Sequence, residues 1–208
     1  MEKKNRVVET HYGNGQLQSR ANYKDDTLDG LCEVWHGNGQ LSSRETFKND
    51  KRDGLSERWY SNGQLRLRET YEDGELNGLC ESWYEHGLPW LRANYKNGNL
   101  DGLWETWYSD GHIWSREIYK DGKLDGLRED WDDNGQMRSR ANYKNGNCDG
   151  LRERWFDNGK LLSRIAYKNG KRDGSREFWY DNGQQWLRET YKDGNRDGLY
   201  NEWDEKGN

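Results

Sequence analysis

Tryptophan recurs in this chain at a fixed interval of 24 residues, without an insertion anywhere. The recurring positions are Trp35, Trp59, Trp83, Trp107, Trp131, Trp155, Trp179 and Trp203. An arginine, an aromatic residue and a glycine recur at the same interval, starting at Arg20, Tyr23 and Gly30. A glutamate also precedes most of the tryptophans by two residues, starting at Glu33. Self-similarity at a fixed period indicates a repeat architecture, so we interpret these tryptophans as structural residues of the repeat.

Two turn signals divide each repeat into two short segments. One is the Asn-Gly or Asp-Gly that follows the tryptophan, as at 62–63, and the other follows the tyrosine, as at 121–122. Such pairs supply the positive φ angles that tight hairpins require. The segments between them, such as 64–71 and 103–108, alternate and are rich in aromatic residues, which is typical of strands. We therefore predict an all-β fold, an elongated antiparallel β-hairpin meander or solenoid of about seventeen strands.

The period also sets the predicted organisation of the chain. Residues 1–6 are an N-terminal tail, and residues 7–12 are a half-repeat strand in which Val7, Glu9 and His11 take the places of Leu31, Glu33 and Trp35. The eight 24-residue repeats are 13–36, 37–60, 61–84, 85–108, 109–132, 133–156, 157–180 and 181–204, followed by a C-terminal tail at 205–208.

Composition excludes several classes of protein. Only 30% of the chain is hydrophobic and 34% is charged, but twelve Trp and thirteen Tyr are too many for a disordered tail. A thin sheet without a deep interior accommodates this balance. The net charge of -5 gives no electrostatic reason to expect nucleic acid, an anionic membrane or phosphoinositides as partners. No apolar run approaches the ~20 residues that span a bilayer, and the start of the chain lacks the apolar segment of a signal peptide.

Cysteine placement indicates a reducing compartment. Cys32 and Cys80 occupy equivalent positions two repeats apart, which is ~19 Å at the usual strand spacing and well beyond the ~7 Å limit for a disulfide. Cys148 occupies a different position in its repeat. Three unpaired thiols are typical of intracellular proteins, so we expect a cytoplasmic location.

The repeat motif resembles a known family. Residues 62–83 read Asn-Gly-Gln-Leu, then Arg, Tyr, Gly and Asn-Gly-Leu at fixed positions, and end in Glu-x-Trp. This motif, which recurs over residues 7–207, resembles the MORN-type repeat, in the variant found in YwqK-type antitoxins and in MORN repeat proteins of giant viruses. The resemblance implies an elongated array of β-hairpins that acts as a scaffold, as a protein-binding module or, in some members, in association with lipid, without catalysis of its own.

A predicted bulge sets which residues share a face of the sheet. If Asp29-Gly30 forms a bulge, Trp35 lies opposite Leu41 and Glu33 lies opposite Ser43. Arg20 then shares the opposite face with the positions equivalent to 18, 32 and 34, which differ from repeat to repeat. A register error of one residue would exchange the faces and place the arginines beside the glutamates instead.

Four tryptophans lie outside the periodic positions, and we predict a partner-binding surface around three of them. The predicted register places Trp90, Trp104 and Trp114 in one patch and Leu162, Phe178 and Trp186 in a second row. Trp, Tyr and Arg dominate the hot spots of protein interfaces. An equally weighted alternative is that these residues only thicken the sheet. The candidate partner-binding residues are Trp90, Arg92, Trp104, Trp114, Arg116, Leu162, Phe178 and Trp186.

Catalytic, cofactor-binding and metal-binding residues are not predicted. The four histidines, His11, His36, His86 and His112, fall at four different repeat positions, so nothing pairs them. The glutamates from Glu33 to Glu177 form a row rather than a facing pair, and we expect them to bond neighbouring Ser, Trp or Tyr groups. We expect the arginine row to cover aromatic surface by cation–π stacking.

Three hypotheses for function follow. The first is a non-enzymatic scaffold that docks a protein on its variable face. The second, suggested by the resemblance, is an antitoxin that neutralises a toxin by direct binding. The third is a structural element that associates end to end through its terminal strand edges, because stacked repeats leave those edges open.

Overall fold

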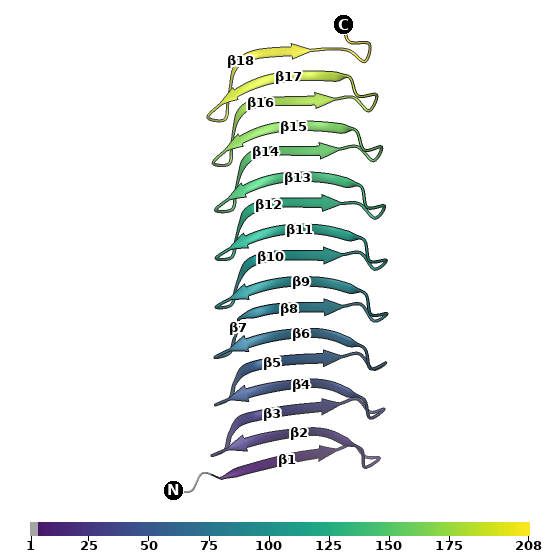
Figure 1. Ribbon diagram of the computed structural model, residues 1–208, viewed down its shortest axis with the longest axis vertical. Coiled ribbons are helices and arrows are strands. Elements are labelled where there is room, and N and C mark those ends of the chain that lie inside the picture. The colour runs from purple at the N-terminus through teal and green to yellow at the C-terminus, as the bar shows by residue number, and fades with distance from the viewer. Residues whose placement is uncertain (1–3) are drawn as a thin grey trace. The chain divides into compact units, whose positions relative to one another are not determined.

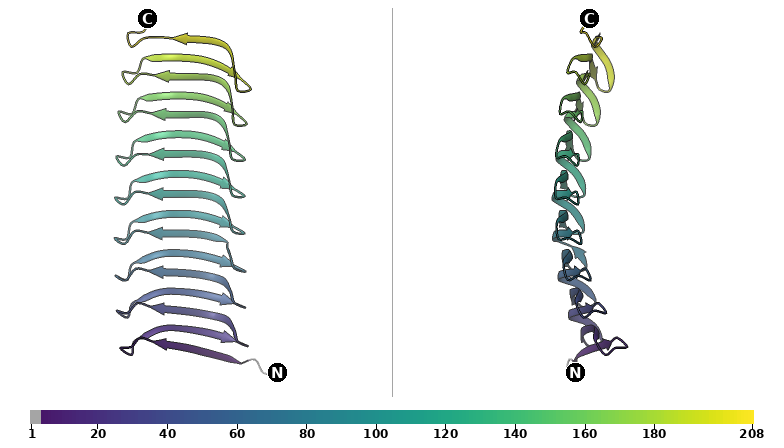
Figure 2. Two further views of the ribbon diagram at one scale, coloured as in Figure 1. Left: turned by 180° about the vertical axis from the view of Figure 1, so that it is seen from behind. Right: turned by 90° about the vertical axis from the view of Figure 1, so that its right-hand side faces the viewer.

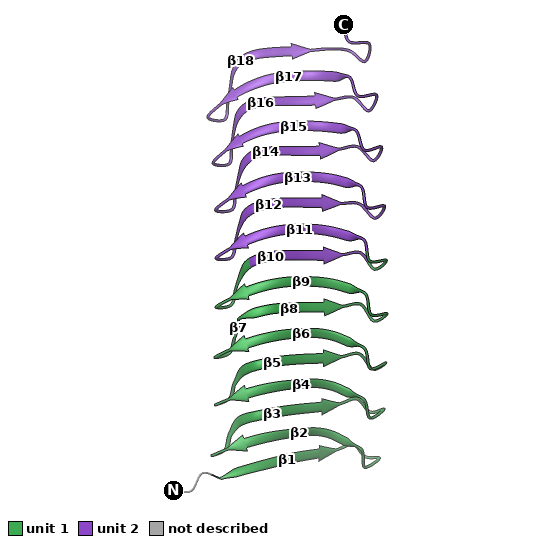
Figure 3. Cartoon of the chain, viewed as in Figure 1, with its two compact units in different colours: residues 1–101, 109–111 green, residues 102–108, 112–208 purple. Residues whose placement is uncertain are grey.

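The computed structural model describes residues 4–208, and these residues contain β-strands and no helix. The chain divides into two compact units (Figure 3). Unit 1 comprises the residues up to 101 together with 109–111, and unit 2 comprises 102–108 and 112–208. The all-β prediction is confirmed.

Unit 1 is a meander in which each strand pairs antiparallel with the next along the chain (Figure 1). Its strands are β1 (Asn5–His11), β2 (Leu17–Lys24), β3 (Thr27–Trp35), β4 (Leu41–Lys48), β5 (Lys51–Trp59), β6 (Leu65–Glu72), β7 (Glu75–Leu76), β8 (Gly78–Trp83) and β9 (Pro89–Lys96). Both β7 and β8 pair with β6. They are therefore two parts of one repeat strand, interrupted at Asn77.

Unit 2 repeats the same antiparallel pattern in a single layer (Figure 2). Its strands are β10 (Asn99–Trp107, which begins in unit 1), β11 (Ile113–Lys120), β12 (Lys123–Trp131), β13 (Met137–Lys144), β14 (Asn147–Trp155), β15 (Leu161–Lys168), β16 (Lys171–Trp179), β17 (Gln185–Lys192) and β18 (Asn195–Glu202). Both turns of each predicted repeat connect neighbouring strands.

The turn that follows the tyrosine is a two-residue hairpin loop. Lys120 pairs with Lys123 across Asp121 and Gly122, whose φ angles are 49° and 75°. Positive φ at both central residues matches the right-handed twist of the flanking strands, which explains why Asn-Gly and Asp-Gly recur here.

The register contains the predicted bulge. Gly30 has a φ of 112°, and the pairing shifts between Ala21, which lies opposite Cys32, and Tyr23, which lies opposite Leu28. A Cβ at Gly30 would also approach the Cβ of Asn22 to 3.2 Å. Glycine is therefore required both for its backbone conformation and for its lack of a side chain.

A second bulge was not predicted, and it makes the predicted register wrong. Trp35 lies opposite Leu41 as expected, but the register shifts by one residue just before Trp35. Glu33 therefore lies opposite Arg44 rather than Ser43. The alternative register that the sequence had left open, with the arginines beside the glutamates, is the one observed.

The two faces of the strands consequently differ from those predicted. One face, here called the ladder face, carries the Glu33 and Arg44 positions of the repeats. The other, here called the variable face, carries the positions equivalent to Cys32 and Val34. The arginines equivalent to Arg20 do not lie on the variable face, because each is opposite a glutamate of the ladder face.

Most buried side chains of these sheets are polar. The buried hydrophobic residues among those described are Cys80, Ala93, Ala141 and Leu187. The buried polar residues are Glu33, Ser56, Glu57, Ser82, Glu105, Thr106, Ser115, Glu117, Glu129, Ser163 and Glu189. A buried carboxylate is costly unless it is paired, so the packing depends on what these glutamates contact.

Candidate functional site: the variable face

An alternating row of glutamates and arginines runs across the ladder face. Arg44 lies directly opposite Glu33 on one neighbouring strand and Glu57 on the other, and its Nε donates to Glu33 Oε1 at 3.0 Å. Equivalent ion pairs recur with N–O distances of 2.8 to 3.3 Å. They are Glu9–Arg20, Glu33–Arg44, Glu57–Arg68, Glu81–Arg92, Glu105–Arg116, Glu129–Arg140, Glu153–Arg164 and Glu177–Arg188.

Arginines of the ladder also lie over tryptophan rings. The guanidinium carbon of Arg20 is 5.8 Å from the ring centroid of Trp35, within the range of cation–π attraction. The same contact joins Arg44 to Trp59, Arg116 to Trp131 and Arg164 to Trp179. The predicted covering role is confirmed for these four arginines. The predicted Ser, Trp or Tyr partners of the glutamates in this row are wrong, because the glutamates pair with arginines. Each of these arginines is therefore paired with a carboxylate of the same face.

Successive repeats are also joined by the residue that follows the tryptophan. Tyr60 donates from its hydroxyl to the backbone carbonyl of Trp83 at 2.8 Å. The equivalent bonds run from Tyr12 to Trp35, from Tyr108 to Trp131 and from Tyr180 to Trp203. The glutamates, arginines and tyrosines described so far have their partners within the chain. We therefore take the variable face as the candidate site.

The residues predicted to bind a partner are divided between the two faces. Arg92 and Arg116 lie on the ladder face, paired with Glu81 and Glu105. Trp104 is opposite Glu117 on β11. The predicted placement of Trp104 between the two arginines is therefore wrong, because it relied on the incorrect register.

The additional tryptophans remain candidates for contact with a partner. Trp90 of unit 1 is 45% exposed and Trp114 of unit 2 is 49% exposed. The Trp114 ring centroid lies 6.1 Å from that of Tyr108. Their part in binding stays a prediction.

The predicted second row is present in part. The ring of Phe178 contacts that of Trp186 with centroids 5.4 Å apart, and Tyr180 lies 6.3 Å from the same indole. Leu162 lines a hollow of about 480 Å³ together with Trp114 and Trp155. Apolar side chains thus gather at two places on the variable face of unit 2.

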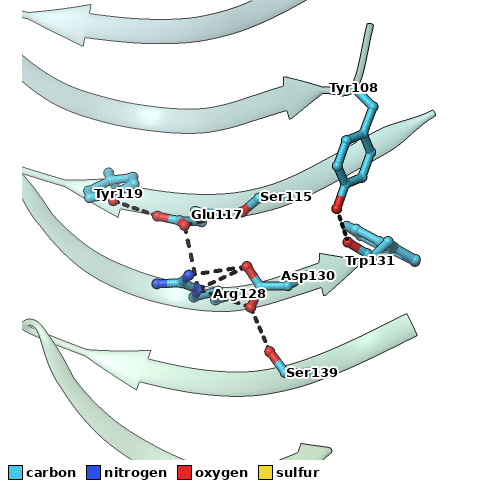
Figure 4. A network of polar contacts seen from close by, with 8 residues as sticks. All are labelled: Tyr108, Ser115, Glu117, Tyr119, Arg128, Asp130, Trp131 and Ser139. Atoms are coloured by element: carbon cyan, nitrogen blue, oxygen red, sulfur yellow. Dashed lines mark hydrogen bonds and ion pairs between the residues drawn. The ribbon is translucent and has the colours of Figure 1, made fainter. Parts of the chain in front are cut away.

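A network of polar contacts occupies the variable face over β11, β12 and β13 (Figure 4). Glu117 accepts hydrogen bonds from Tyr119 at 2.5 Å and from Ser115 at 3.2 Å, and pairs with Arg128 at 3.5 Å. Asp130 completes the network with an ion pair to Arg128 at 3.1 Å. The single arginine therefore has two carboxylate partners.

A second network lies over β16, β17 and β18. Glu189 is 1% exposed and pairs with Arg176 and Arg196, each at 2.7 Å, and it accepts a hydrogen bond from Tyr191 at 3.0 Å. Burial alone raises the pKa of Glu189, but the bonds from Arg176 and Tyr191 outweigh burial and leave its pKa below the ordinary value. This carboxylate is held ionised by two arginines.

Three arginines between the two networks have no carboxylate partner among residues 4–208. They are Arg138, Arg152 and Arg154, here called the basic cluster. Arg152 lies between Ala141 on β13 and Ile165 on β15, and Arg154 lies between two serines. Arg138 and Arg154 are exposed. The cluster therefore presents uncompensated positive charge.

The basic cluster adjoins apolar surface on two sides. Arg138 and Arg154 line the hollow that contains Trp114, Trp155 and Leu162. Arg154 also lines a second hollow, with Arg152, Ile165 and Phe178. Arg172 lines the same hollow and donates a hydrogen bond to the Tyr191 hydroxyl. Positive charge and apolar contact area are thus available within the same short stretch of sheet.

Sequence reasoning missed the basic cluster. Arginine occupies the position equivalent to Cys32 in three consecutive repeats, as Arg128, Arg152 and Arg176. In sequence these look alike. The register distinguishes them. Arg152 lies opposite an alanine and an isoleucine, whereas Arg128 and Arg176 each lie opposite a glutamate on one neighbouring strand.

Cys32, Cys80 and Cys148 are free thiols. Burial, followed by the charges of Glu69 and Glu81, raises the pKa of Cys80 to about 11. Within residues 4–208, no group of three or more His, Cys, Asp or Glu side chains is placed to hold a metal ion. The same part of the chain has no helix long and apolar enough to cross a bilayer.

The fold and the recurring ladder define a repeat protein built from antiparallel β-hairpins. Comparison with family models matches the MORN repeat variant at seven segments that together cover more than half of the chain. They are residues 7–25, 28–49, 52–73, 100–121, 124–145, 149–169 and 172–193. The chain therefore belongs to the MORN repeat variant family. A search of curated proteins found no match.

Proposed function

We propose that this chain is a protein-interaction module that docks a partner protein on its variable face. MORN repeats are generally non-enzymatic repeat modules that are consistent with a role in interactions. The ladder face has the same charged residues in every repeat and is internally neutralised. A row of charges that recurs in every repeat cannot distinguish one repeat from another, whereas the positions equivalent to Cys32 and Val34 on the variable face differ between repeats.

The observation that carries the proposal is the exposure of single, non-repeated aromatic residues. Trp114 is 49% exposed on a chain whose periodic tryptophans are only partly accessible. Exposed tryptophan beside unpaired arginine is the composition of an interface hot spot. The proposal includes no catalysis, and the three free thiols favour a reducing, cytoplasmic setting.

Affinity capture from the native host followed by mass spectrometry tests this function. We expect the wild-type chain to enrich a specific protein, and the triple variant of Trp90, Trp104 and Trp114 to alanine to lose it while keeping the β-sheet circular dichroism. The identity of the captured protein would show whether the partner is a toxin. Retention of the protein by a folded triple variant would contradict docking through these residues, and unfolding of the variant would assign them to the structure instead.

A further inference from the structure

We propose that the variable face of unit 2 binds an extended acidic peptide segment, and that the basic cluster of Arg138, Arg152 and Arg154 recognises its carboxylates. This inference rests on the proposed function, for which it names the chemistry of the partner. It is carried by charge complementarity, because Arg138 and Arg154 line one hollow, Arg152 and Arg154 line another, and none of the three forms an ion pair with residues 4–208.

Strand geometry indicates the form of the ligand. Arg152 and Arg154 are two residues apart on β14, so their side chains leave the same face about 7 Å apart. In an extended peptide, carboxylates at alternate positions have the same spacing. A peptide that runs along β14 with acidic residues at two alternate positions can therefore pair with both guanidinium groups at once, and bidentate Arg–carboxylate pairs add geometric specificity.

Apolar surface beside the cluster supplies a second point of recognition. The hollow lined by Trp114, Trp155 and Leu162 adjoins Arg138 and Arg154. An aromatic or leucine side chain next to the acidic residues would remove this apolar surface from water. An acidic segment with one apolar residue therefore fits both features of the site.

A long polyanion fits this surface less well. Glu117 and Asp130 lie at one end of the basic cluster, and Glu189 lies at the other. A continuous phosphate backbone that followed the face would meet these carboxylates, and the chain as a whole carries a net charge of -5. The uncompensated charge is confined to the strands between the two networks, which matches a short acidic segment rather than a nucleic acid strand.

The equivalent surface of unit 1 has one arginine without a carboxylate partner among residues 4–208, Arg66 at the position of Arg138, and it lies over the ring of Tyr60 rather than beside further unpaired arginines. The positions equivalent to Arg152 hold Cys32, Ser56 and Cys80. The position equivalent to Arg154 holds Arg58 in one repeat, but this arginine is paired with Glu45 at 3.4 Å. We therefore place the acidic-peptide site in unit 2 alone.

Nuclear magnetic resonance of the arginine Nε–Hε groups in the full chain provides a direct test. The probe is a short synthetic peptide with glutamates at alternate positions and a central leucine. We expect it to shift the resonances of Arg152 and Arg154 in a saturable and salt-sensitive manner, and we expect its glutamine counterpart to leave them unchanged. The variant R152Q/R154Q should bind the peptide at least about tenfold more weakly. The matched control K144Q/K168Q, which removes the same charge from exposed positions of unit 2, should bind as the wild type does.

Several results would overturn the inference. One is equal binding of the glutamate and glutamine peptides, and another is the absence of any shift. A third is tighter binding of a short oligothymidylate at the same arginines, which would assign the site to nucleic acid. A fourth is self-association of the free chain that R152Q/R154Q abolishes, which would make a second copy the occupant. If the peptide fails but the tryptophan-dependent capture described above persists, this inference is wrong and the proposed function stands.

Discussion

Arg152 of β14 lies directly opposite Ile165 of β15, and its neighbour on the other side is Ala141. The equivalent arginines two strands away on either side each have a glutamate opposite, Glu117 or Glu189. Arg152 therefore keeps an uncompensated positive charge, because neither of the residues opposite it is a carboxylate. A carboxylate introduced at position 165 would therefore pair with Arg152 and compete with an acidic peptide for it.

Ile165→Glu should neutralise Arg152 from within the chain. The equivalent position holds glutamate at Glu117 and Glu189, so the fold accepts this residue. We expect the ion pair to offset part of the lost apolar burial and the free energy of unfolding to fall by no more than about 1 kcal/mol. Binding of the acidic peptide should weaken at least about tenfold, whereas Ile165→Gln should retain it. Equal binding by both variants in a fluorescence anisotropy titration would refute the role of Arg152.

Glu189→Gln should be among the most destabilising isosteric changes on the variable face. Glutamine leaves Arg176 and Arg196 without an anion, and we expect a loss of about 2 kcal/mol, reduced from the value for a fully buried pair because Arg196 is largely exposed. Glu69→Gln at the equivalent position is the matched control, because Glu69 forms no ion pair within residues 4–208 and bonds Tyr71. Urea unfolding of the two variants should therefore give clearly different midpoints.

Acidification provides a second measurement on the same pair of proteins. The pKa of Glu189 lies below its ordinary value because the bonds from Arg176 and Tyr191 outweigh burial. A group of this kind stabilises the fold fully above its unfolded pKa, and that stability is lost as the pH falls through the folded pKa. The stability difference between wild type and Glu189→Gln should be constant from neutral pH to about pH 5 and should shrink below that. A difference that grows on acidification would contradict the ion pairs.

Tyr60→Phe should weaken the connection between successive repeats. The change removes the hydrogen bond to the carbonyl of Trp83, at a cost of about 1 kcal/mol. The equivalent position holds phenylalanine at Phe156. The reverse substitution, Phe156→Tyr, should therefore raise the free energy of unfolding by a similar amount. Chemical unfolding of both variants measures these two changes in the free energy of unfolding. Changes of the same sign would contradict a stabilising role of this hydrogen bond.

Cys80 should be poorly reactive in the native chain. Its raised pKa of about 11 implies about a hundredfold less thiolate at pH 8 than an ordinary thiol two units lower would have. A variant that retains only Cys80 should react with DTNB at least about a hundredfold more slowly when folded than in urea. The variant that retains only Cys148 should show a smaller ratio, because Cys148 is less buried. Equal ratios would show that burial does not protect Cys80.

Periodicity was sufficient to predict the strands, the hairpin turns and the bulge at Gly30, because each depends on local residues with marked backbone preferences. The register was not predictable to the same degree. The second bulge, beside Trp35, has no glycine or proline to mark it, and one unpaired residue exchanges the faces. The basic cluster depends on this register, since Arg128 and Arg152 differ only in the residues opposite them.

Site-specific photo-cross-linking from the two faces tests the central claim most directly. Benzoylphenylalanine would replace Arg138, which lines a hollow with Arg154 of the variable face, or Ile118 on the ladder face. Both residues are exposed and belong to unit 2. With the partner captured from the native host, we predict covalent adducts from position 138 and none from position 118. Adducts from position 118 alone would place the partner on the ladder face and contradict the account.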